Sequence, residues 1–342
     1  MLRPSVERQC VRRHEVQRAK IVMSQGASGK MTVKETLFED IYNPHLLISF
    51  NDSSRNKCFE GNREHRVCKF CGKSKPERQF RKIAHTIPAA LGNDFYFSYE
   101  ECDTCNDIGS QFEDDLCKFL APDRALARRR SRGGNKLKIL PDESFIESTP
   151  ASNRVTIQIE DEGGSIQFER LSGNAMRIHC KRPKYSPMGV ARSLMRMAIF
   201  YLNHEIPGVQ DTIGWLNGNV HLEPIILHGF IKGSGLTHTT LGIFIRKPGF
   251  TEPHEFVVQL CYGFSVLYGF YHTTSSAQNT CVLVPDPTKS SISPACEFKE
   301  KPKTVKKEDK IESLSISFDL SYNEIVTEES RQLACDNLRL RP

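Results

Sequence analysis

Apolar and polar residues alternate along the middle of the chain in a way that is typical of β-strands. The alternation covers residues 154–159, 165–170 and 176–181, and turn-forming residues separate the three runs. Successive side chains of a strand point to opposite faces, so each run offers one face to a core and one to water. We therefore expect an antiparallel meander in this region.

Helical spacing replaces the alternation at Ser186. This serine is a good amino-terminal cap, and Pro187 suits the first helical position because no amide donor is needed there. A helix with one buried face is predicted to end before Pro207, while Arg192, Arg196 and Asn203 point away from that face. The apolar stripe consists of Val190, Leu194, Met197, Ala198, Tyr201 and Leu202.

Further strand-like runs follow the helix, at residues 225–231, 239–246, 255–271 and 281–285. Together these elements predict an α+β domain with an antiparallel sheet over residues 150–285. Its role is left open among target recognition, dimerisation and regulation. Residues 286–342 are rich in Lys, Pro and Ser, so we expect a linker and tail, in which residues 311–325 pack back on the domain.

The amino-terminal residues 1–45 lack the apolar periodicity of a folded element in their first part. They carry several arginines and then a Ser-Gln-Gly-Ala-Ser-Gly stretch from Ser24 to Gly29. We interpret this segment as a poorly ordered basic arm. Two alternatives stay open, namely an arm that contacts phosphates and a chain whose true start is Met23 or Met31.

Length and charge set only broad limits. With 342 residues the chain has room for about two domains of ordinary size. The formal net charge of +6 is compatible with a polyanionic partner, but many proteins without one are equally basic. Neither an apolar run long enough to span a bilayer nor a signal core is present, so we expect a cytoplasmic protein without a membrane partner.

Four of the 12 cysteines occur in two short pairs. Cys68 and Cys71 form one Cys-x-x-Cys motif, and Cys102 and Cys105 form the other. Two such pairs can place four thiolates at the corners of a tetrahedron, which is the arrangement that structural zinc prefers. Because four protein ligands leave no open coordination position, this zinc is expected to be structural and not catalytic.

The residues between and after the two pairs resemble a known family. From Ala84 to Asn93 the chain reads Ala-His-Thr-Ile-Pro-Ala-Ala-Leu-Gly-Asn, and Asn106 directly follows the last cysteine. In order and spacing this pattern resembles the HNH endonucleases of bacteria and phages. The resemblance covers about a quarter of the chain and implies a zinc-knuckled ββα-metal nuclease domain, which we place at residues 50–140, before the second α+β domain.

In the ββα-metal fold a β-hairpin that carries a histidine packs on a helix. The sequence is compatible with this arrangement, since residues 93–99 suit the second hairpin strand. Residues 107–120 suit the helix, with Phe112, Leu116 and Phe119 or Leu120 on one face.

The resemblance also implies roles for three residues. His85 matches the histidine that acts as general base, Asn106 matches a ligand of a catalytic Mg²⁺ or Mn²⁺ ion, and Asn93 matches a position that holds the loop in place. One departure is Ala84, because many HNH sites have an acidic metal ligand there. Glu113 does not replace it, since seven helical residues separate it from Asn106 by about 10.5 Å.

A basic stretch follows the predicted helix, and its side chains suit sequence-independent contact with phosphates. A solvated loop is the alternative. The residues expected to bind nucleic acid are Arg128, Arg129, Arg130, Arg132 and Lys136.

These observations favour a metal-dependent endonuclease that hydrolyses phosphodiester bonds, with DNA favoured over RNA as substrate, in a bacterial or phage-encoded protein of defence or mobile-element type. Two alternatives remain. The chain is either a zinc-knuckle nucleic-acid-binding protein without activity or a nuclease effector that its carboxy-terminal domain regulates. A homodimer is also left open.

Overall fold

The structure is a computed structural model of the chain. It describes residues 20–21, 36–50, 56–126, 145–149, 154–158, 166–170, 175–181, 183, 185–230, 239–250, 254–263, 265–272, 283–284, 293–294 and 313–319.

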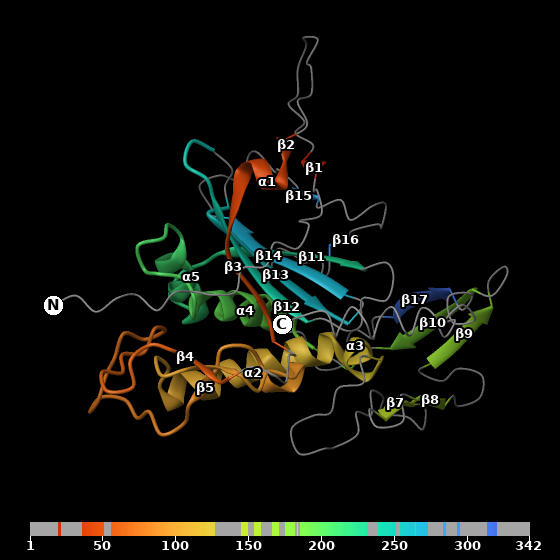
Figure 1. Cartoon of the computed structure of the whole chain (residues 1–342), viewed down its shortest axis with the longest axis horizontal. Coiled ribbons are helices and arrows are strands. Elements are labelled where there is room, and N and C mark those ends of the chain that lie inside the picture. Colours follow the sequence, from red (N-terminus) through yellow and green to blue (C-terminus); the bar gives the residue numbers. More distant parts are fainter. Residues whose placement is uncertain are drawn as a thin grey trace, which may run out of the picture.

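A six-stranded antiparallel sheet forms the centre of the molecule (Figure 1). Its strand order is β16-β11-β14-β13-β12-β3. The strands are β3 (Tyr42–Ser49), β11 (Glu223–Phe230), β12 (Thr240–Arg246), β13 (Phe256–Tyr262), β14 (Ser265–His272) and β16 (Ser293–Pro294). The apolar run at residues 255–271 therefore folds as two strands, because the chain turns at Gly263, whose φ of 59° suits glycine.

The two faces of this sheet contribute to different apolar clusters. Along β13, Phe256, Val258 and Leu260 belong to the main core, whereas Val257 belongs to a smaller cluster on the other face. Helix α1 (Phe38–Ile41) covers that second face, where Phe38 contacts Phe244 edge to face. The alternation of strand side chains thus gives the sheet two buried faces.

Helix α4 (Pro187–Ile199) covers the first face of the sheet. The predicted start is confirmed, since the Ser186 hydroxyl accepts a hydrogen bond from the Gly189 amide at 3.2 Å. The helix ends at Ile199, well before Pro207, and a separate helix α5 (Val209–Leu216) follows.

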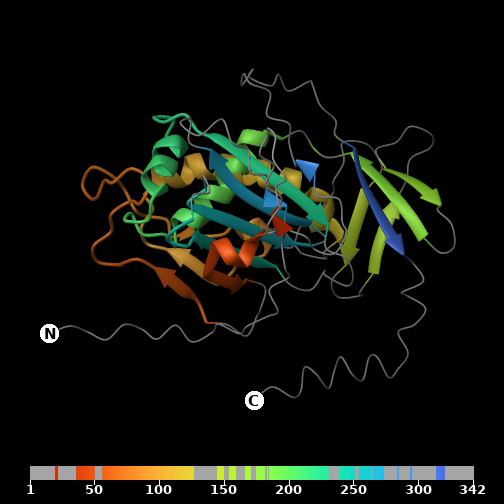
Figure 2. The ribbon, with the colours of Figure 1, turned by 90° about the horizontal axis from the view of Figure 1, so that it is seen from above.

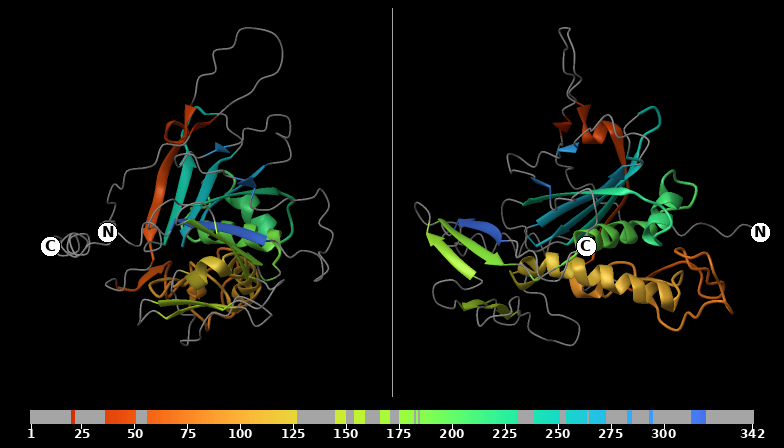
Figure 3. Two further views of the ribbon diagram at one scale, coloured as in Figure 1. Left: turned by 90° about the vertical axis from the view of Figure 1, so that its right-hand side faces the viewer. Right: turned by 180° about the vertical axis from the view of Figure 1, so that it is seen from behind.

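A third layer lies on the far side of α4 (Figure 3). It contains α2 (Asp103–Phe119), which packs along α4, and α3 (Ala121–Leu126). The order from one side to the other is thus sheet, α4, α2. The helix predicted at residues 107–120 begins four residues earlier in the structure, at the second cysteine pair.

A small sheet accompanies α2, with the strand order β4-β6-β5. The predicted hairpin consists of β5 (Ala84–His85) and β6 (Tyr96–Ser98), which pair antiparallel. Strand β6 is shorter than the predicted residues 93–99, because Asn93 belongs to the preceding loop. The sequence did not predict β4 (Cys58–Glu60), which pairs parallel with β6.

The predicted meander is wrong for one strand. Strands β9 (Ile166–Arg170) and β10 (Ala175–Lys181) pair antiparallel, but β8 (Arg154–Gln158) pairs with β7 (Phe145–Thr149). Within residues 311–325, β17 (Ser313–Asp319) pairs with β10, so this segment packs back as expected. Figure 2 shows these strands beside the central sheet.

Three short strands form a further sheet in the order β15-β1-β2. They are β1 (Lys20–Ile21), β2 (Thr36–Leu37) and β15 (Leu283–Val284). The arm predicted at residues 1–45 extends too far toward the carboxy terminus, because residues 36–45 form β2, α1 and the first part of β3. Pairing of β3 with β12 buries backbone polar groups that an arm would leave in water.

The nuclease-like segment and the second predicted domain share one core. A single cluster of buried apolar residues includes Phe70, Leu116 and Phe119 from the first, and Leu194 and Leu260 from the second. Phe119 also contacts the rings of Tyr185 and His228 edge to face. The boundary expected near residue 150 therefore does not separate two independent cores among the described residues.

Candidate functional site

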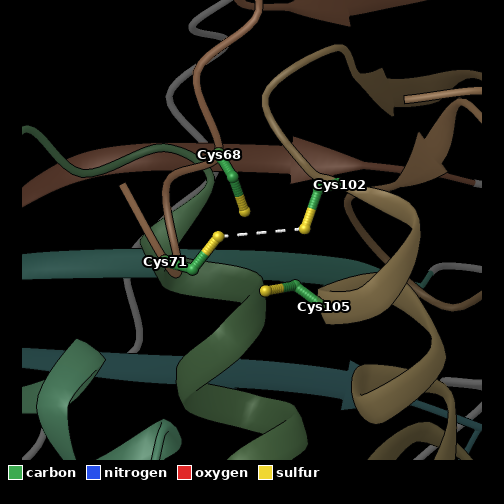
Figure 4. A group of neighbouring side chains, drawn as sticks. All are labelled: Cys68, Cys71, Cys102 and Cys105. Atoms are coloured by element: carbon green, nitrogen blue, oxygen red, sulfur yellow. Dashed lines mark hydrogen bonds between the residues drawn. The ribbon is translucent and has the colours of Figure 1, made fainter. Parts of the chain in front are cut away.

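The four paired cysteines converge on one point (Figure 4). Cys68 and Cys71 come from a loop, while Cys102 and Cys105 come from the start of α2. All four Sγ atoms lie within 4.8 Å of one another, and those of Cys71 and Cys102 are 3.8 Å apart. Zinc with Zn–S bonds near 2.3 Å has sulfur atoms about 3.8 Å apart, so the cluster fits a tetrahedral zinc ion.

The thiols interact strongly with one another. A hydrogen bond from Cys105 lowers the pKa of Cys68 to about 4. The same contact, together with burial, raises the pKa of Cys105, and burial raises the pKa of Cys102. The site therefore accommodates one thiolate readily, but a second or third needs a cation nearby, which a metal ion supplies.

Local backbone geometry shapes the first cysteine pair. The Gly72 amide donates to the Cys68 carbonyl at 2.8 Å, and the Cys68 amide donates to the Lys73 carbonyl at 2.9 Å. Gly72 has a φ of 68°, a value that favours glycine, and this explains why glycine directly follows the pair. The turn is therefore encoded locally.

Two polar side chains tie this turn to the helices of the central layer. The Lys69 ammonium donates to the Phe200 carbonyl at 2.7 Å, just past the end of α4. A cation is favourable there because the last carbonyls of a helix lack partners. The Asn217 amide at the end of α5 donates to the Phe70 carbonyl at 2.6 Å.

A buried ion pair joins α4 to the second cysteine pair. Arg196, which the sequence pattern placed away from the core, is only 5% exposed and donates to Glu101, next to Cys102. Its guanidinium lies 4.4 Å from the centroid of the Phe70 ring. Burial lowers the pKa of Arg196 to about 9. The expectation was wrong because a charged residue can be buried when it has a partner.

Gly109 makes room for that arginine. A Cβ atom at this position of α2 would overlap the Arg196 guanidinium. The sequence contains no local signal for this contact, since glycine inside a helix and arginine on another helix are each common.

The segment before β5 is fixed to the first turn of α2. Asp103 accepts from the Arg81 amide at 2.9 Å and from the Arg81 Nε at 2.9 Å, and Lys82 forms an ion pair with Asp107 at 2.7 Å. Burial alone would raise the pKa of Asp103, but the hydrogen bonds from Arg81 and from the Lys82 amide hold it below its usual range. These contacts place β5, and His85 with it, beside the start of α2.

His85 lies on the outer face of the small sheet. It is half-buried, its register partner is Phe97 on β6, and the two ring centroids are 4.7 Å apart. The next residue, Thr86, is buried and shares a hydrogen bond of 2.6 Å with the hydroxyl of Tyr201, just after α4. The sequence did not predict this contact for Tyr201.

Asn93 ties together the loop between β5 and β6. Its amide donates to the carbonyls of Ile87 and Tyr96 at 2.7 and 2.9 Å, and its oxygen accepts from the Phe95 and Tyr96 amides. The side chain is fully buried. This is a structural arrangement, and a part for Asn93 in catalysis stays a prediction.

Asn106 lies in the first turn of α2 and is half-buried. The nearest acidic residues of that turn, Asp103 and Asp107, already pair with Arg81 and Lys82. Within the described ranges, the four cysteines form the only group of three or more His, Cys, Asp or Glu residues arranged to hold a metal ion. Ala84, buried next to His85, offers no ligand. The acidic ligand that many HNH sites have before the histidine is therefore absent at position 84.

Five expected site residues lie outside the described residues. They are Arg128, Arg129, Arg130, Arg132 and Lys136. Their contact with nucleic acid stays a prediction.

Comparison with protein families identifies the segment that carries the two cysteine pairs, His85, Asn93 and Asn106. Residues 68–118 match the family model described as HNH endonuclease. The chain therefore carries an HNH endonuclease domain, with its four-cysteine cluster and mixed helix and strand content, and nucleic acid is the partner that this domain implies. No curated protein and no solved structure matches the chain.

In the part of the chain that the structure describes, no helix has the length and apolar character that crossing a bilayer requires.

Proposed function

We propose that this protein is an endonuclease that hydrolyses phosphodiester bonds in DNA, with His85 as its general base. The observation that supports this most directly is the HNH family match, because residues 68–118 include His85, Asn93 and Asn106 in the order of the motif. Zinc held by the four cysteines would stabilise the fold and take no part in the reaction.

His85 suits the removal of a proton from an attacking water. An imidazole can take up a proton near neutral pH, which a general base in this reaction has to do. Its ring packs on Phe97, and the Thr86 contact with Tyr201 fixes the backbone beside it. A base held in this way needs little reorganisation when water and phosphate are in place.

The reaction also needs a cation beside the phosphate. Asn106 would hold a Mg²⁺ or Mn²⁺ ion through its side-chain oxygen, with phosphate oxygens and water as the other ligands. Such an ion neutralises charge on the phosphoryl and leaving oxygens. The ion pairs of Asp103 and Asp107 orient the first turn of α2, which carries Asn106, against β5.

The test is cleavage of supercoiled plasmid by the purified full chain, with and without added magnesium or manganese. We expect His85→Ala to lower the cleavage rate by about 10²- to 10⁴-fold, the usual effect of removing a general base. Zinc content, thermal stability and DNA affinity should not change. His221→Ala, at an exposed histidine, is the matched control.

The Asn106→Ala variant separates the metal role from the base role. It should need a higher magnesium or manganese concentration for the same rate, and excess metal should partly restore cleavage. If His85→Ala cuts as fast as wild type, His85 is not the base.

A second candidate function is binding without cleavage, and the missing carboxylate at Ala84 favours it. It would be supported if wild type binds nucleic acid but cuts neither double-stranded DNA, single-stranded DNA nor RNA with either metal.

A further inference from the structure

Aromatic rings form a row across the outer face of the small sheet. Phe59 on β4 is the register partner of Phe97 on β6, and Phe97 is in turn the partner of His85 on β5. Register partners point to the same face, so these three rings lie side by side. Tyr99 extends the row, because it follows Phe97 by two positions along the chain.

The ring of Phe59 lies nearly parallel to those of Phe97 and Tyr99. Phe59 stacks on Phe97 with centroids 5.3 Å apart and an angle of 22° between the planes, and on Tyr99 with 5.0 Å and 10°. Phe59 is nevertheless 41% exposed, which is unusual for so large an apolar side chain. Core packing therefore does not explain why this residue is aromatic.

Phe97 and Tyr99 are the two ends of the row of rings that stack on Phe59, and a cation lies over each of them. The Lys57 ammonium is 5.5 Å from the centroid of Phe97, and the Arg66 guanidinium is 4.9 Å from that of Tyr99. Beyond Arg66 is a cavity of about 620 Å³, lined among others by Arg63, His65, Arg66 and Lys75, with Glu64 as the single acidic residue of its lining. The surface thus combines a partly exposed aromatic ring with positive charge.

We propose that this row, consisting of Phe59, Phe97 and Tyr99 with Lys57 and Arg66, binds unpaired nucleotides of a single strand beside His85. The inference rests on the proposed function, because it names the form of nucleic acid that the nuclease site takes. Bases stack on the exposed ring of Phe59, and the backbone phosphates contact Lys57, Arg66 and the basic cavity.

The positive charge beside the rings favours a nucleic acid strand over a peptide as the ligand. An apolar peptide would gain nothing from cations at both ends of the row, whereas a nucleotide chain carries a flat base and an anionic phosphate at every step. In a duplex the faces of the bases are already stacked on one another, so the rings can bind them only where the strand is unpaired. Unpaired DNA and unpaired RNA share this chemistry.

The experiment uses the full zinc-loaded chain without added magnesium or manganese, so that binding is measured without cleavage. Affinities for fluorescent oligo-dT, oligo-U and a mixed-sequence DNA duplex are compared by anisotropy. We expect Phe59→Leu, which keeps apolar bulk but loses the π-face, to weaken single-strand binding about 10-fold and duplex binding less than 2-fold. Phe59→Tyr should bind like wild type, and Val220→Ala, at another exposed apolar position, should have no effect.

A direct probe of stacking is Phe59→Trp. The chain has one other tryptophan, Trp215, which is 3% exposed, so the new indole should give the signal that an oligonucleotide quenches. Quenching by either oligonucleotide supports the inference. The one that binds more tightly shows whether the preferred strand is DNA or RNA.

The inference is overturned if Phe59→Leu binds single strands as well as wild type does, or if the indole is not quenched. Either result leaves the proposed function intact, because plasmid cleavage and its loss in His85→Ala are measured separately. Conversely, a chain that never cuts but shows the Phe59 effects would refute the nuclease proposal and keep the single-strand site.

Discussion

The HNH segment (residues 56–126) and the central sheet with α4 are each stabilised by a different kind of contact. In the first, residues 56–102 contain short strands and one 3-10 helix (Ala89–Leu91), and their shape depends on four thiols, the Asn93 side chain and a few ion pairs. In the second, strands of seven or eight residues pack alternating apolar side chains on a helix. Directional contacts add to the shared apolar core in the first region, whereas apolar burial distributed over many residues holds the second.

This difference determines how each region responds to a single change. Distributed burial loses a part of its stability with each truncated side chain, whereas a metal cluster loses its function when one ligand is removed. The buried pair of Arg196 and Glu101 lies where the two regions meet, so it tests whether they unfold together.

The largest effect is expected from removal of a cysteine ligand. Purified protein should contain close to one zinc per chain, and Cys105→Ser should lower the melting temperature by about 10 °C or more, because several kcal/mol of metal binding are lost. Elemental analysis and thermal unfolding measure this. Cys58→Ser, at an exposed cysteine, is the control and should change little. A zinc-free protein that is folded and active would contradict the assignment.

A smaller effect is expected where the two regions meet. Gly109→Ala forces a methyl group against the Arg196 guanidinium, whose partner Glu101 is buried, so we expect a loss of about 2–4 kcal/mol in the free energy of unfolding. Denaturant unfolding measures it, with the exposed Gln111→Ala on the same helix as control. A loss confined to zinc retention, with unchanged unfolding of the sheet, would show that the regions unfold independently.

The smallest effect on the free energy of unfolding is expected from the Glu113 carboxylate on α2, whose burial costs stability when it is charged. Burial raises the pKa of Glu113 to about 7, so its charged form is disfavoured in the folded state. The penalty is absent below the ordinary value near 4.5 and complete above about 7. Glu113→Gln should therefore stabilise the protein at pH 8 by on the order of 1 kcal/mol and much less at pH 5. The exposed Asp114→Asn should show no such trend. Equal effects of Glu113→Gln at both pH values would disprove the penalty.

Sequence patterns predicted the regular parts of this protein well. The cap at Ser186 and the alternation within β9 to β14 are local properties, so one sequence suffices to find them. The partner of β8 was missed because pairing depends on which strand reaches it in space, and alternation is the same in either sheet.

The candidate site was predictable where chemistry and spacing coincide. The four cysteines meet because two short pairs on a loop and a helix start can share one ion. Two contacts join residues that are far apart in the chain, namely Arg196 with Glu101 and Thr86 with Tyr201. None of these four residue types is unusual at its own position. These pairs form where α4 and the residues just after it lie against the layer that contains α2 and the small sheet.

The shared core has a consequence for how such an HNH domain can be transferred between genes. A shortened product that ends after α3 would leave Phe70, Leu116 and Phe119 without the side chains of α4 and the sheet that now cover them. Exposed aromatic and aliphatic surface of this kind promotes aggregation. We therefore expect recombination that moved the HNH segment alone to deliver an aggregation-prone fragment, whereas transfer together with α4 and the central sheet keeps these side chains covered.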